Sequence, residues 1–71
     1  MIIQSIMFPI NKFTLSQAAS WIKKNNYKLS FYGKQPETLG KFHRFRQAAP
    51  KDTAKYYTKK LDNGIIFIFM K

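Results

Sequence analysis

The chain has 71 residues, with thirteen Lys or Arg against three Asp or Glu, a formal net charge of +10 and no cysteine. A chain this short fits one small domain, residues 1–71, near the lower size limit for folding without a staple. The absence of cysteine excludes disulfides and cysteine-ligated zinc, and it fits an intracellular setting. The charge lies above the magnitude of roughly 2–8 usual for a small domain, which indicates a polyanionic partner such as nucleic acid, anionic lipid or an acidic protein.

The first two predicted elements are a strand and a helix. Ile2–Phe8 is mostly apolar and predicts a strand that Pro9 ends, since proline cannot donate to a sheet ladder. Thr14 and Gln17 have the spacing of a capping box, which predicts a helix start. Four residues then share one helical face and are expected to pack on a sheet: Leu15, Ala18, Ala19 and Ile22. The helix should end at residues 25–26, two asparagines that tolerate left-handed geometry.

The middle of the chain predicts two further strands separated by a loop. Tyr27–Tyr32 is aromatic and alternating, so it predicts a strand, and Gly33–Gly40 predicts the longest loop because glycines bound it and it carries a proline. Lys41–Gln47 interleaves basic and aromatic residues and predicts the next strand. Lys51–Lys55 is short and polar, and we expect a single helical turn there.

The predicted strand at residues 41–47 has two unlike faces, because successive side chains of a strand point to opposite sides. One face holds Phe42, Arg44 and Arg46, and the other holds His43, Phe45 and Gln47. We expect Arg44 and Arg46 to be largely exposed, since long charged side chains are seldom buried without a partner. Phe45 should pack beneath the helix.

The end of the chain carries the clearest turn signal. Asn63-Gly64 separates Tyr56–Leu61 from Ile65–Met70, and Asn-Gly between strand-prone runs predicts a hairpin in which Gly64 has a positive φ. The final run is apolar on both faces, so it should lie inside the sheet rather than at its edge. The predicted fold class is α+β: a single helix packed on a small antiparallel sheet of four or five strands, in the order β-α-β-β-β-β.

Five short motifs are spread over nearly the whole chain: Trp21-Ile22-Lys23-Lys24, Tyr27-Lys28, Phe45-Arg46-Gln47 with Pro50, Thr58-Lys59-Lys60-Leu61 and Asn63-Gly64-Ile65. Together they resemble a small uncharacterised domain found in proteins of large DNA viruses and bacteriophages. The resemblance implies a viral or phage source, with a location in the virion or the infected host cell, and a fold of mixed α and β structure. It implies no particular activity.

Catalysis and metal binding find little support in the sequence. The carboxylates are Glu37, Asp52 and Asp62, all in predicted loops, and His43 is the single histidine. A metal site or a general acid–base pair needs several such groups at matched spacing. The three glycines are scattered and form no phosphate-binding loop. We therefore expect neither an enzyme nor a bound cofactor or metal.

Nucleic-acid binding is the function that the composition favours. Basic side chains attract phosphates without reading sequence, and exposed aromatic rings can stack on bases. We expect little sequence specificity, and DNA rather than RNA on the strength of the viral resemblance. The expected binding residues are Lys34, Lys41, His43, Arg44, Arg46, Tyr56, Lys59 and Lys60.

A structural or adaptor protein is the alternative. Such a protein would bind an acidic surface of a viral or host protein, or it would pair a sheet edge with another chain or form a homo-oligomer. Membrane binding is disfavoured, because the helix is short and its apolar face is needed for the sheet. The apolar run at residues 65–70 is far shorter than the ~20 residues that span a bilayer, and the amino terminus lacks the pattern of a secretion signal. We expect no transmembrane segment and no secretion.

Overall fold

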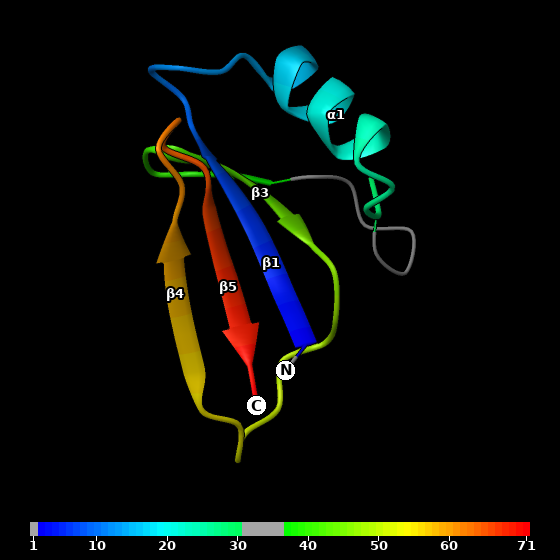
Figure 1. Cartoon of the computed structure of the whole chain (residues 1–71), viewed down its shortest axis with the longest axis vertical. Coiled ribbons are helices and arrows are strands. Elements are labelled where there is room, and N and C mark those ends of the chain that lie inside the picture. Colours follow the sequence, from blue (N-terminus) through cyan, green and yellow to red (C-terminus); the bar gives the residue numbers. More distant parts are fainter. Residues whose placement is uncertain (1, 31–36) are drawn as a thin grey trace.

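Helix α1 lies on one face of an antiparallel sheet of five strands in the computed structural model, which describes residues 2–30 and 37–71 (Figure 1). The elements are β1 (Ile2–Pro9), α1 (Leu15–Lys24), β2 (Glu37–Leu39), β3 (Phe42–Arg46), β4 (Tyr56–Lys60) and β5 (Ile66–Met70). Their order across the sheet is β2-β3-β1-β5-β4. The predicted α+β class is confirmed, with five strands.

Strand β1 is the centre of the sheet, and it pairs antiparallel with both β3 and β5. Ile6 of β1 lies between Phe45 of β3 and Phe67 of β5, and these side chains are buried under Ala18 and Ile22 of α1. Phe45 therefore packs beneath the helix as expected. Burying such large apolar side chains contributes about 1.5–3 kcal/mol each, which a domain of this size requires.

Several aromatic rings pack against one another between helix and sheet. Phe8 of β1 contacts Phe13, Trp21 and Phe45 edge-on, with ring centroids 5.3, 5.6 and 5.4 Å away. Trp21 also stacks on Tyr27 at 5.9 Å. Edge-to-face pairs of this kind add about 0.5–1.5 kcal/mol each beyond the area that they bury.

The helix starts and ends where the sequence indicates. Thr14 and Gln17 form the full capping box, and Asn26 follows the helix with a φ of +62°. The predicted apolar face is only partly correct, because Leu15 is 44% exposed. Trp21 lies against the core instead, as its ring contacts show. Within the described part of the chain, no helix has the length and apolar character needed to cross a bilayer.

The prediction for the segment after the helix is wrong. Residues 27–30 form no strand, while 31–36 lie outside the described residues. The backbone N–H and carbonyl of Lys28 are hydrogen-bonded to the side chain of Gln47. These backbone groups therefore pair with a side chain and not with a neighbouring strand. The predicted loop also contains β2, which pairs with β3 through a tight turn at Gly40, where φ is +57°.

The closing hairpin is confirmed. Strands β4 and β5 flank Asn63-Gly64, where the Asn63 side-chain oxygen accepts from the Ile65 N–H and Gly64 has a φ of +92°. Strand β5 lies between β1 and β4, so the strand that is apolar on both faces is internal. Lys51–Lys55 forms a hydrogen-bonded turn, from the Ala54 N–H to the Lys51 carbonyl, rather than the expected turn of helix.

Candidate nucleic-acid interface

One face of the sheet points away from α1, and we call it the open face. The strand registers define it: Met7 lies opposite Arg44, and Lys60 lies opposite Ile66. Along β3 and β5 these positions alternate with the side chains that face the helix. The basic and aromatic residues of the open face are Phe42, Arg44, Arg46, Tyr56 and Lys60.

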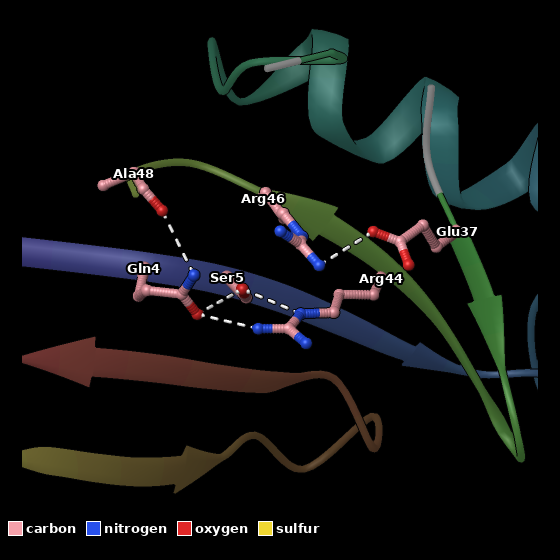
Figure 2. Close-up of polar contacts among 6 residues, drawn as sticks. All are labelled: Gln4, Ser5, Glu37, Arg44, Arg46 and Ala48. Carbon is pink, nitrogen blue, oxygen red and sulfur yellow. Dashed lines mark hydrogen bonds and ion pairs between the residues drawn. The ribbon is translucent and has the colours of Figure 1, made fainter. Parts of the chain in front are cut away.

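Arg44 is anchored on the open face rather than free in solvent (Figure 2). Its Nε donates to Ser5 Oγ at 3.1 Å and its Nη2 to Gln4 Oε1 at 3.0 Å. Ser5 Oγ also donates to Gln4 Oε1 at 2.5 Å, and Gln4 Nε2 donates to the Ala48 carbonyl at 3.1 Å. Gln4 and Ser5 are buried where the β1 register shifts against β5. The Arg44 guanidinium therefore supplies hydrogen-bond donors to side-chain oxygens of buried residues.

Arg46 is also held, in this case by a carboxylate. Its Nη2 lies 3.1 Å from Glu37 Oε1 of β2, and the two side chains are 30% and 36% exposed. Its Nε is buried without a hydrogen-bond partner among the described residues. The expectation that Arg44 and Arg46 are both largely exposed is therefore wrong, because polar groups from β1 and β2 reach them. Glu37 also neutralises much of the charge that Arg46 would offer to a phosphate.

His43 does not belong to the open face. It is 9% exposed, its Cα partner is the buried Phe8, and its Nδ1 lies 2.8 Å from Thr38 Oγ1. The alternation of β3 places it beside Phe45 on the helix side. The assignment of His43 to the nucleic-acid-binding surface is corrected on this geometry, since a buried ring cannot contact a phosphate backbone.

A cavity of about 480 Å³ lies at one end of the sheet, where the segment after β1, the turn before β3 and the β4–β5 hairpin meet. We call it the basic pocket; it is lined by Pro9–Lys12, Lys41, Phe42, Lys60, Gly64 and Ile66. Three lysines thus surround one cavity, and the described residues that line it include no carboxylate. Two of the expected binding residues, Lys41 and Lys60, are brought together here.

Lys12 reaches the pocket because Gly64 has no side chain. A Cβ built on Gly64 would lie 3.2 Å from Pro9 Cγ, 3.3 Å from Lys12 Cδ and 3.5 Å from Lys12 Nζ. The stem of Lys12 therefore lies directly on the hairpin. Lys12 was missed by the sequence analysis. It stands about fifty residues from Lys60 in the chain, and the two line one cavity because β1 pairs with β5 and β5 pairs with β4.

The remaining expected residues are dispersed. Lys59 is exposed, but its Cα partner is the helix-facing Phe67, so it lies on the opposite face from Lys60. Tyr56 is 45% exposed, and its hydroxyl exchanges hydrogen bonds with the Lys51 backbone at the other end of the sheet. Lys34 lies outside the described residues.

Comparisons with protein-family models, with curated proteins and with solved structures find no match to this chain. Residues 2–30 and 37–71 contain no group of three or more His, Asp or Glu placed to hold a metal ion. Function is therefore inferred from the charge and geometry of the open face and the basic pocket.

Proposed function

We propose that this protein binds nucleic acid through the open face and the basic pocket, with little sequence preference. The observation that carries the proposal is the meeting of Lys12, Lys41 and Lys60 at one cavity, on the same side of the sheet as Arg44. Like charges brought together without carboxylates repel one another, and an anionic partner removes that repulsion. With thirteen basic and three acidic residues in the chain, internal pairing cannot remove it.

The two kinds of cation have different roles in this proposal. Lysine is a flexible point charge, so Lys41 and Lys60 attract phosphates without fixing their orientation. Arg44 is ordered in advance by Ser5 and Gln4, and it loses less conformational freedom when it meets a phosphate. The half-buried Phe42 lies between these groups on β3.

Single strands fit this surface better than duplexes. Phe42 and the exposed Tyr56 present rings on the open face, and rings stack on unpaired bases whatever their sequence. A duplex keeps its bases stacked inside and would use only the cations. DNA is proposed over RNA on the viral resemblance alone.

The test is the dependence of affinity on salt. If Lys12, Lys41, Lys60 and Arg44 each neutralise one phosphate, the slope of log affinity against log salt should be about −2.8 for a single strand and about −3.6 for a duplex. Fluorescence anisotropy with labelled single-stranded DNA, duplex DNA and RNA at several salt concentrations measures it. A slope near zero, or no binding at low salt, contradicts the proposal.

A protein-binding adaptor is the second candidate, and strand β4 favours it. All five β4 residues are exposed, and β4 is the last strand of the sheet on its side, so its outer backbone groups can pair with an added strand. Lys59 and Lys60 would favour an acidic partner. The salt titration separates the two candidates, because an adaptor of this kind needs no affinity for random nucleic acid.

A further inference from the structure

The basic pocket brings cationic and apolar side chains together around one cavity. Lys12, Lys41 and Lys60 bring positive charge to its lining, while Pro9, Phe42 and Ile66 bring apolar surface. A ligand that uses both must be an anion with an apolar or aromatic part. The volume of about 480 Å³ lies within the range of roughly 300–1,000 Å³ that small-molecule sites occupy.

The segments around the pocket are tied to one another. The Ile10 N–H donates to the Lys41 carbonyl at 2.9 Å, which joins the segment after β1 to the turn before β3. In the hairpin, the Leu61 N–H donates to the Ile65 carbonyl at 2.8 Å and the Gly64 N–H donates to the Leu61 carbonyl at 3.0 Å. Lys12 lies on Gly64. A cavity whose walls are fixed before binding loses little freedom on taking a ligand.

We propose that the basic pocket holds one nucleotide of a bound strand, with its phosphate at the lysines and its base against Phe42 and Ile66. This inference rests on the proposed function. It adds where on the surface a nucleotide binds and that the pocket takes one nucleotide. A phosphate alone would use only the lysines, and a nucleoside alone would use only the apolar side chains. A free nucleoside monophosphate should therefore bind more tightly than either part.

The first test titrates the folded protein with thymidine monophosphate, thymidine and inorganic phosphate, followed by the backbone amide resonances. Thymidine monophosphate should shift the amides of Lys12, Lys41, Phe42 and Gly64, and it should bind at least about tenfold more tightly than the other two, a factor worth about 1.4 kcal/mol. Equal affinity for phosphate and the nucleotide, or shifts outside the pocket, would overturn the assignment.

The second test uses neighbouring lysines as a matched pair. Lys60 lines the pocket and Lys59 lies on the opposite face of the same strand, and both are exposed. Lys60→Gln should weaken thymidine monophosphate binding about tenfold, the loss expected for one charge-assisted hydrogen bond, whereas Lys59→Gln should change it less than about twofold. Equal losses in the two variants would mean that charge acts without a pocket.

An oligothymidylate titration distinguishes failure of the pocket from failure of the proposed function. If the oligonucleotide binds with the expected salt dependence while the mononucleotide does not, the pocket assignment is wrong and nucleic-acid binding stands. If neither binds, both are wrong. If the mononucleotide binds in the pocket and the oligonucleotide does not bind at all, the nucleotide is a free ligand, and its assignment to a bound strand is overturned.

Discussion

Ser5 and Gln4 are buried polar residues in the central strand. Apolar residues at these positions would need no hydrogen-bond partners. The register shift between Ile3 and Ser5 gathers both side chains near Arg44, and the three residues satisfy one another. A hydrogen bond to a charged group contributes about 1.5–3 kcal/mol, and Arg44 donates two such bonds to this network. Arg44 is therefore part of the fold as well as of the proposed interface.

This dual role predicts that Arg44→Met lowers the free energy of unfolding by about 1–3 kcal/mol, because Ser5 Oγ and Gln4 Oε1 lose their guanidinium donors. Urea denaturation followed by tryptophan fluorescence measures the change. Lys60→Met is the matched control, since it removes the same charge from the same face at an exposed position, and it should change stability by less than about 0.5 kcal/mol. Equal stabilities would show that the Arg44 contacts contribute nothing to folding.

At the scale of elements, the β4–β5 hairpin has two tasks, since it closes the sheet and forms a wall of the basic pocket. Gly64 serves both. Its positive φ suits the turn, and its missing Cβ leaves room for the side chains of Pro9 and Lys12 beside the hairpin. Gly40 provides a comparison, because it also has a positive φ but has open space around it.

We predict that Gly64→Ala destabilises the protein more than Gly40→Ala does. Both changes strain the backbone, at a cost of about 1 kcal/mol or more each. Only at Gly64 must the new Cβ also displace Pro9 or Lys12, which it would approach at 3.2–3.3 Å. Thermal melts of the two variants give the difference. A smaller loss at Gly64 would mean that the Lys12 stem moves aside freely.

The helix and the hairpin were predictable from the sequence because their signals are local. Thr14 and Gln17 stand three residues apart, and Asn63-Gly64 is a dipeptide. Strand β2 was missed because a strand of three residues exists only through its pairing with β3. The same reason applies to the site: the partners of Arg44 lie 39 and 40 residues away in the chain, so their contact with it follows from the register alone.

At the scale of the whole molecule, net charge opposes folding. The protein measures 33 × 28 × 24 Å, and at about 0.01 M salt the screening length is roughly 30 Å, so every basic residue repels nearly every other. At about 0.1 M salt that length falls to roughly 10 Å, and most of these interactions are screened. The half-exposed Arg46–Glu37 pair opposes the trend, but such pairs are worth only about 0–1 kcal/mol.

Salt should therefore raise the melting temperature between about 0.01 M and about 0.1 M sodium chloride, since relief of repulsion outweighs the weakening of the Arg46–Glu37 pair. Differential scanning calorimetry measures the rise. A variant with Lys51→Glu and Lys55→Glu, two exposed positions, has a net charge four units lower than +10 and should show a smaller rise. An unchanged or falling melting temperature in the parent chain would mean that repulsion is not the main electrostatic influence on stability.

The start of β1 and the end of β5 lie together, at the end of the sheet opposite the basic pocket (Figure 1). Ile2 of β1 is the Cα partner of Met70 of β5, and β1 runs eight residues before it reaches the pocket at Pro9. At ~3.4 Å per residue that separation is roughly 24 Å. A fluorophore, an affinity tag or a surface linker attached at either end should leave the pocket facing outward, so immobilised protein can be used in place of free protein to measure ligand capture.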